Sequence, residues 1–568
     1  MIKKILNKLS KILPILLILA VIPAAIKLIT PFSFTFHDES QIVNLHQFIQ
    51  TISLGQFPPR WALDVHFTYG SPYPEFNYQL PYYIGFLFNK IGFSLFDSYT
   101  LCLALSLFVG AYGMYLFAKK YTTPFASFAS AILYTYTPYR AIDAYVRGTV
   151  GESFALAIFP WILYSLARLK EKQNLKNILI LGISVASLIL SHQPSTAFGL
   201  PILVGIYFMV ELIQKNYKFI LSLFAGLFSS LLLTSYYLIP VFAEKGYIKE
   251  VLPYNLYDHF PFIWQLIYSR WGYGASNWGP YDDMSFQIGI VNLAVILGAI
   301  IFLVIKSKKE KKVEKGYLLA SLLATFFVIF MMNIRSSFIW NIFPFTNAIQ
   351  FPWRLLSLTT ILTATLFVFI SKNMSKKTQI VTSLIVIIAS FTLSVSYFRP
   401  GEITATPDDH FLRRYLPNQV LLPGEKVSKE YLDYTENYMP LPVNAVRPTD
   451  VPVAKITSAL QAAQIDIIDV NPFNTKAYIS SEIDSFITVN TFYFPGWNIA
   501  IDGKPVDVTL DQFGAMKVFV PAGEHTLKVK FLDTPIRRIS NIISLIAWIF
   551  VAFIIIKQTN LQIRGKRR

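Results

Sequence analysis

Long hydrophobic runs recur along most of the 568-residue chain. Each is roughly 18 residues or longer, which is enough to cross a bilayer core of about 30 Å. The composition agrees, because only 15% of the residues are charged, whereas soluble proteins carry about 25%. The sequence therefore predicts an α-helical membrane protein that crosses the lipid bilayer many times.

The net charge of +17 is distributed as membrane topology requires. Lys and Arg gather in short segments between alternate hydrophobic runs, which is typical of loops on the cytoplasmic side. No basic stripe interleaved with aromatic residues occurs in a soluble module, so nucleic acid is not an expected partner. The single Cys102 lies in a hydrophobic run and excludes a disulfide framework within one chain.

Hydropathy and charge together predict about 12 spans, with both termini in the cytoplasm. The first follows four lysines and lacks a cleavage pattern, so we expect a retained signal anchor. The expected spans are residues 12–30, 98–118, 123–138, 153–168, 176–191, 196–213, 218–239, 286–305, 316–333, 354–371, 378–397 and 539–556. The segments expected inside are all basic: 168–176, 215–218, 306–315, 372–377 and the tail 557–568.

The chain divides into a membrane domain at 1–397, an extracytoplasmic domain at 398–536, and a last span with a basic tail at 537–568. The membrane domain includes an extracytoplasmic loop at 31–97. Within it, 79–93 is apolar but too short to span, so an interfacial helix is expected.

Alternating polar and apolar residues at 476–479 and 525–530 predict strands in the extracytoplasmic domain. Asp502-Gly503 predicts a hairpin turn between two of its strands. From residue 451 onward we expect a small antiparallel β-sandwich. The Pro- and Tyr-rich stretch 404–448 is expected to be irregular.

Three chemically active side chains follow the first span: His37, Asp38 and Glu39. Adjacent carboxylates at the end of a membrane helix are costly unless they are solvated, paired or bound to metal. They could supply a general base or ligands for a divalent cation. The alternative is simple solvation of a helix end.

Other charged residues are expected at the same membrane face. Arg140, Arg147 and Glu152 follow the third span, where arginines could bind a phosphate or pair with neighbouring acids. His192 closes the fifth span and is either a partner of the helix dipole or part of a site. Arg354 begins the tenth span and could hold a lipid phosphate, either in a substrate or in the bilayer itself.

Several catalytic patterns are missing from the sequence. It contains no G-x-S-x-G nucleophile motif and no H-E-x-x-H metal motif. No Walker or G-x-G-x-x-G loop occurs in the cytoplasmic segments, which argues against a nucleotide-driven pump.

Taken together, these stretches resemble the GT-C class of membrane glycosyltransferases. The closer resemblance is to the bacterial YfhO-type proteins and the "6-pyruvoyl-tetrahydropterin synthase-related" membrane proteins. The matching stretches are the His37-Asp38 loop, 147–152, 191–194, 351–354, 494–497 with Asp502-Gly503, and 520–525.

The resemblance implies sugar transfer from a polyprenyl-phosphate donor to a cell-envelope acceptor, at the extracytoplasmic face of the cytoplasmic membrane. Asp38 would be the catalytic base, and Arg354, with Arg147 or Arg140, would stabilise the departing phosphate. His37, Glu39, Glu152 and His192 would support them. Whether Asp38 and Glu39 hold a divalent cation is left open by the resemblance.

Two other functions remain open from the sequence. In the first, the extracytoplasmic β-domain binds envelope glycan and the helices only anchor it. In the second, the protein is a transporter, which would place ionisable groups at mid-membrane and broken helices in both halves. The charged residues gather at helix ends instead, so the transporter is the less favoured of the two.

Overall fold

The fold is taken from a computed structural model of the chain. It describes residues 2–30, 32–249, 255–305, 312–343, 349–404, 411–412, 415–416, 426, 440–449, 451–458, 463–469 and 471–566. Most of the stretch expected to be irregular, 404–448, lies outside these residues.

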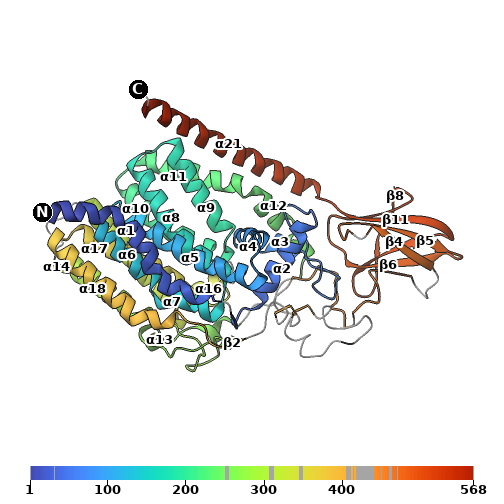
Figure 1. Cartoon of the computed structure of the whole chain (residues 1–568), viewed down its shortest axis with the longest axis horizontal. Coiled ribbons are helices and arrows are strands. Elements are labelled where there is room, and N and C mark those ends of the chain that lie inside the picture. Colours follow the sequence, from blue (N-terminus) through green and yellow to red (C-terminus); the bar gives the residue numbers. More distant parts are fainter. Residues whose placement is uncertain are drawn as a thin grey trace.

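Long helices run side by side in a bundle, with a β-domain at one end (Figure 1). The main helices are α1 (Ile2–Ala25), α5 (Leu95–Ala118), α6 (Pro124–Thr135), α8 (Val150–Glu171), α9 (Leu175–Ile189), α10 (Gln193–Ile213), α11 (Tyr217–Leu233), α12 (Ser235–Glu244), α14 (Ile290–Ile305), α15 (Lys312–Met331), α17 (Leu356–Lys372), α18 (Lys376–Ser394) and α21 (Pro535–Lys566). The shorter helices are α2 (Ser40–Ser53), α3 (Tyr73–Phe76), α4 (Leu80–Lys90), α7 (Pro138–Ala141), α13 (Ile263–Ile267) and α16 (Ser337–Ile342).

The prediction of a polytopic helical membrane domain is confirmed, but the number of spans is not. In the described part of the chain, six helices are long and apolar enough to cross a bilayer, or up to eight if two sharply bent pairs each count as one span. Residues 123–138 contain only α6, whose 12 residues fall short of the roughly 20 that a span needs. The expected interfacial segment does form a helix, α4, at the end of the bundle near the β-domain (Figure 1).

Two helices form the centre of the bundle. The apolar stretches of α8 and α17 are almost entirely buried, whereas those of α18 and α21 are mostly exposed at the periphery. Both chain termini lie at the end of the bundle away from the β-domain (Figure 1).

The β-domain is an antiparallel sandwich, as the alternating pattern predicts. One sheet has the order β3-β6-β10-β9 and the other β4-β5-β11-β7-β8, and their inner faces form one apolar core. The strands are β3 (Ile456–Ser458), β4 (Ala463–Asp469), β5 (Asn474–Ser481), β6 (Ser485–Phe492), β7 (Trp497–Ile501), β8 (Lys504–Pro505), β9 (Thr509–Leu510), β10 (Ala515–Val520) and β11 (Gly523–Phe531).

The expected hairpin turn is present. Ile501 pairs with Lys504, and the two residues between them, Asp502 and Gly503, both have positive φ angles of 50° and 79°. These φ angles are those of a two-residue hairpin turn, whose twist matches the twist of the antiparallel strands that it joins. Asp-Gly adopts this turn readily.

A buried ionic cluster lies where α21 leaves the β-domain. Arg537 is fully buried, and its Nε lies 3.1 Å from Glu75 Oε2 and 3.0 Å from Glu244 Oε2. Arg60, also fully buried, donates to Tyr236 O and Asn541 Oδ1. The cluster therefore ties the loop before α4 to both α12 and α21.

Burial raises the pKa of Glu75 to about 8; the charges of Arg537 and Arg60 act in the opposite direction, and Glu244 adds to the rise. Because this pKa exceeds the ordinary 4.5, protonation of Glu75 favours the folded state. That contribution is complete below pH 4.5 and is lost as the pH rises through about 8.

We predict that the melting temperature of the detergent-solubilised protein falls between pH 5 and pH 8 more steeply for the wild type than for Glu75→Gln. The amide keeps the shape of the neutral acid and does not titrate. Glu171→Gln, which changes an exposed carboxylate paired with Lys120, is the control and should follow the wild type. Parallel curves for wild type and Glu75→Gln would contradict the prediction.

Candidate functional site

Two sets of backbone contacts fix the loop that carries Asp38. Strand β1 (Ser33–Phe34) pairs antiparallel with β2 (Ile403–Thr404). His37 N then donates to Val146 O and Asp38 N to Arg147 O, each at 2.9 Å. The loop after the first helix is thereby joined to the segment before α8, more than 100 residues away in the sequence.

Gly148 makes this close approach possible. Its φ of 67° lies in the left-handed region, and a Cβ on it would lie 2.4 Å from the Phe36 ring. Any larger residue would be strained and would push the Asp38 loop away.

Arg147 lies at the centre of a cluster of carboxylates. It ends a π-helical turn, η2 (Ile142–Arg147), of the kind often found at functional sites. Its Nη1 donates to Glu152 Oε2 at 2.6 Å and to Asp143 Oδ1 at 3.1 Å, and its Nη2 lies 3.5 Å from Asp38 Oδ2. The side chain is only 3% exposed, so the guanidinium is committed to these acids.

Two hydroxyl groups also donate hydrogen bonds to the buried carboxylates of Glu152 and Asp143. Tyr139 OH donates to Glu152 Oε1 at 2.6 Å. Ser153 Oγ donates to Asp143 Oδ2 at 3.1 Å. Their positions are therefore fixed from several sides, as buried charges require.

Arg354 comes to the cluster from η7 (Pro352–Leu355), at the start of α17. Its Nη1 donates to Ile349 O and Gln350 Oε1, whereas Nε lies 4.0 Å from Glu152 Oε2. Nε is buried without a hydrogen-bond partner in the described structure, and the side chain is 14% exposed. Arg354 is thus less fully paired than Arg147.

Asp38 is the accessible carboxylate of the site, with 21% of its side chain exposed. Its Oδ1 lies 2.7 Å from His37 Nδ1. Burial favours the neutral acid, but the hydrogen bond from His37 and the charges of Arg147 and Arg354 outweigh it and hold the pKa of Asp38 below its ordinary value. The carboxylate is therefore ionised at neutral pH.

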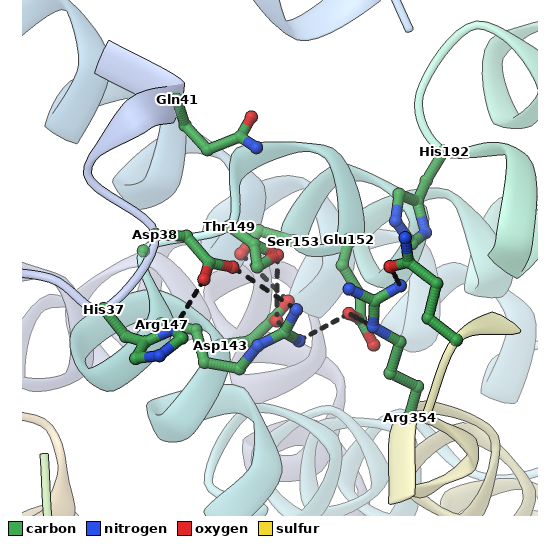
Figure 2. Close-up of polar contacts among 12 residues, drawn as sticks. His37, Asp38, Gln41, Asp143, Arg147, Thr149, Glu152, Ser153, His192 and Arg354 are labelled. Atoms are coloured by element: carbon green, nitrogen blue, oxygen red, sulfur yellow. Dashed lines mark hydrogen bonds and ion pairs between the residues drawn. The ribbon is translucent and has the colours of Figure 1, made fainter. Parts of the chain in front are cut away.

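The structure brings most of the expected site residues together. Figure 2 shows His37 and Asp38 on one side of Arg147 and Glu152, and His192 and Arg354 on the other. His192 does not act at the end of the preceding helix, as the dipole interpretation assumes. It caps the N-terminus of α10, because its Nδ1 accepts a hydrogen bond from Ser195 N at 3.4 Å and also lies 2.8 Å from Ser195 Oγ.

Arg140 is not brought into this cluster. Its Nη2 donates to Ser106 O at 3.1 Å, and its guanidinium lies over the Tyr134 ring. The turn of η2 lies between Arg140 and Arg147, so the two side chains leave the chain in different directions. That of Arg140 points into the contact with α5. The expectation that Arg140 binds a donor phosphate therefore finds no support in its position.

Glu39 differs from its neighbour in burial, since it is 3% exposed. Within the described residues, no group of three or more His, Cys, Asp and Glu side chains is arranged to hold a metal ion. A divalent cation on Asp38 and Glu39 stays a prediction from the sequence.

Sequence reasoning missed a polar network beside Asp38. Tyr78 OH and Tyr82 OH both donate to Gln41 Oε1, the latter at 2.6 Å. The two tyrosine rings stack 5.3 Å apart, and Tyr78 also contacts the His192 ring. Tyr82 lies in α4 but Tyr78 lies just before it, so helical spacing gave no signal for the pair.

Two separate cavities lie along α10, a small one beside Arg354 and a larger apolar groove farther along the helix. A small cavity lined by Glu152, His192 and Arg354 continues onto Ser195 and Gly199 of α10. A larger cavity of about 730 Å³ lies between α10 and α15. One stripe of α10 lines both in turn: Ser195, Gly199, Ile202, Ile206, Met209 and Ile213. At 1.5 Å per residue this stripe is about 27 Å long, close to the thickness of a bilayer core.

The model of one protein family matches residues 76–400, more than half of the chain. The family is described as "6-pyruvoyl-tetrahydropterin synthase related domain; membrane protein". A search of curated proteins gives no significant match.

The chain is also similar to two solved glycosyltransferase structures. One is arabinofuranosyltransferase AftD from Mycobacteria, with 13% identity, a TM-score of 0.44, and coverage of 74% of this chain and 30% of that chain. The other is the oligosaccharyltransferase of Archaeoglobus fulgidus in the apo form, with 10% identity, a TM-score of 0.42, and coverage of 70% and 56%. The chain spans less than two thirds of the length of either protein. The likeness is therefore one of fold, and the activities of the two proteins are not assigned to this chain.

We predict that Gly148→Ala destabilises the protein by at least about 1 kcal/mol, because the left-handed backbone alone costs that much. The contact with Phe36 adds to the loss. The double variant Phe36→Ala/Gly148→Ala removes this contact, so its Asp38 loop should be displaced less than that of Gly148→Ala. Thermal unfolding in detergent measures the effect. Gly298→Ala is the control, because Gly298 lies in α14 with open space around its Cβ; equal melting temperatures for the two alanine variants would contradict the prediction.

Proposed function

We propose that this chain, which belongs to the 6-pyruvoyl-tetrahydropterin synthase related family of membrane proteins, is a glycosyltransferase. It transfers a sugar from a polyprenyl-phosphate donor to a cell-envelope acceptor at the extracytoplasmic face of the cytoplasmic membrane. The observation that carries the proposal is an accessible carboxylate, Asp38, in one site with an incompletely paired cation, Arg354. Arg354 lines a small cavity that lies on the same stripe of α10 as the larger apolar groove.

Asp38 is suited to the acceptor side of the reaction. In the transfer, an acceptor hydroxyl oxygen bonds to the anomeric carbon, and its proton passes to the Asp38 carboxylate. A pKa held low keeps the carboxylate free of a proton at neutral pH but limits its strength as a base. His37, 2.7 Å away, can in turn stabilise the charge and orientation of Asp38.

Arg354 is suited to the donor side. As the bond from the anomeric carbon to the phosphate oxygen breaks, the electron pair stays on that oxygen. A cation placed where negative charge develops stabilises the transition state, and Arg354 Nε has no hydrogen-bond partner among the described groups. Arg147 is buried among carboxylates, so we assign it the role of a positioning residue instead of a phosphate ligand.

The groove along α10 supports a lipid-linked donor over a soluble one. A polyprenyl chain running from Arg354 along this stripe would stay within the bilayer while its phosphate lies at the site. The exposed apolar residues that line the groove, including Met209, Leu323 and Phe327, suit a hydrocarbon ligand. Basic segments at the opposite end of the bundle support placing the site on the extracytoplasmic side.

We predict that Asp38→Asn lowers transfer by at least about 100-fold, because the amide cannot accept the acceptor proton. The measurement is mass spectrometry of envelope glycans and glycolipids from cells lacking the gene and complemented with each variant. Asp502→Asn is a matched control, since Asp502 also pairs with a histidine at 2.7 Å but lies in the β-domain. Normal product from Asp38→Asn would instead favour the alternative of a non-catalytic, glycan-binding membrane protein.

We predict that Gly205→Phe impairs transfer by filling the groove. Gly205 lines the larger cavity, and a Cβ there meets no atom within 4 Å, so a larger side chain can begin at this position without a backbone clash. The half-saturating concentration of a long-chain lipid donor should rise about tenfold or more, since each displaced CH₂ contact is worth about 0.8 kcal/mol. Gly298→Phe, also in open space but away from the groove, should behave as the wild type; equal values for both variants would contradict a lipid in the groove.

A further inference from the structure

The side chain of Gln41 is held in one orientation next to Asp38. It lies in the first turn of α2, three residues after Asp38, and its backbone N–H donates to Asp38 O. Its Oε1 accepts hydrogen bonds from both Tyr78 and Tyr82. Burial raises the pKa of both tyrosines, so each hydroxyl keeps the proton that it donates.

The amide nitrogen is therefore directed away from the tyrosines. With Oε1 occupied, Nε2 is left with two N–H groups to donate, and Figure 2 shows it as the amide atom nearer to the level of Asp38, Glu152 and His192. Within the described part of the chain, Nε2 has no protein acceptor, and the residue is half-buried. A fixed pair of donors on a half-buried side chain next to an accessible carboxylate is an arrangement suited to a ligand hydroxyl.

The surroundings of Tyr78 explain why the orientation is fixed. Its ring packs over Gly151, where a Cβ would come within 2.5 Å of it, and against the His192 ring. The helix that carries Tyr82 is held in turn, because the backbone N–H groups of Gln79 and Leu80 both donate to Leu190 O. The amide is thus supported by groups on α4, α8 and α10.

We propose that Gln41 binds a second hydroxyl group of the acceptor, next to the one that Asp38 deprotonates. The acceptor is then a glycan with neighbouring hydroxyls, and not a protein side chain with a single hydroxyl. The inference rests on the proposed function and adds the class of acceptor to it. It assigns Gln41 to the acceptor side because Figure 2 places it beside Asp38, across the site from Arg354.

The test uses the purified full-length protein in liposomes. The probe is the glycan fraction from cells lacking the gene, titrated as acceptor against a saturating lipid fraction from the same cells as donor. Gln41→Leu should raise the half-saturating acceptor concentration about tenfold, the effect of one lost hydrogen bond to a ligand. The maximal rate should change much less. Tyr83→Phe is the control and should match the wild type, because Tyr83 follows Tyr82 on α4 but is hydrogen-bonded to Gln79 and not to Gln41.

Gln41→Glu separates ligand binding from a purely structural role. The carboxylate keeps both tyrosine hydrogen bonds but cannot donate, so at pH 8 it should resemble Gln41→Leu. As the pH falls to 5.5 a growing fraction is protonated and recovers one donor. The negative charges of Asp38 and Glu152 favour this protonation, whereas Arg147, Arg354, His37 and the hydrogen bonds from Tyr78 and Tyr82 oppose it. The half-saturating acceptor concentration of Gln41→Glu should therefore fall toward the wild-type value, whereas that of Gln41→Leu should not.

Two outcomes would overturn the inference while leaving the proposed function intact. One is an unchanged half-saturating concentration for Gln41→Leu in a protein whose Asp38→Asn variant is inactive. The other is a Gln41→Glu variant that stays like Gln41→Leu at every pH. Absence of transfer by the wild-type protein in this assay would count against the proposed function itself, and the inference would fall with it.

Discussion

The site depends on one buried cation. Arg147 is almost fully buried and contacts three carboxylates, from Asp38, Asp143 and Glu152, while its guanidinium lies over the Trp353 ring at 4.8 Å. A charge taken out of water is costly unless good partners surround it. Three separate segments of the chain, the Asp38 loop, residues 143–152 and η7, therefore meet at this point, and the loop after the first helix adds its own carboxylate.

Burial divides the roles of the charged residues. Arg147 and Glu152 are each about 3% exposed or less, so their hydrogen bonds are used within the protein. Asp38 and Arg354, at the margin of the same cluster, keep part of their surface accessible. Buried pairs of this kind hold their neighbours in place, whereas the accessible members are the ones that can meet a substrate.

The sequence predicted the parts of the fold that follow from local pattern. Hydrophobic runs predicted the helices, and Asp502-Gly503 predicted a hairpin because that turn needs two positive φ angles. Charged residues at helix ends predicted the cluster of Asp38, Arg147, Glu152 and Arg354. Pattern alone could not separate Arg140 from Arg147, since the π-helical turn between them decides which one faces the cluster. The Gln41 network was also out of reach, because it needs α2 and α4 to be packed together.

Two aspartate–histidine pairs in this chain show why the motif by itself carries little meaning. His37 with Asp38 and His525 with Asp502 have the same 2.7 Å separation. In the β-domain, the other oxygen of Asp502 accepts from Thr526 N and closes a hairpin, and half of the side chain is exposed. In the bundle, the other oxygen of Asp38 faces Arg147, with the buried acids behind it. The same pair thus stabilises a turn in one place and presents a charged group over a buried ionic cluster in the other, and the cation behind Asp38 makes that difference.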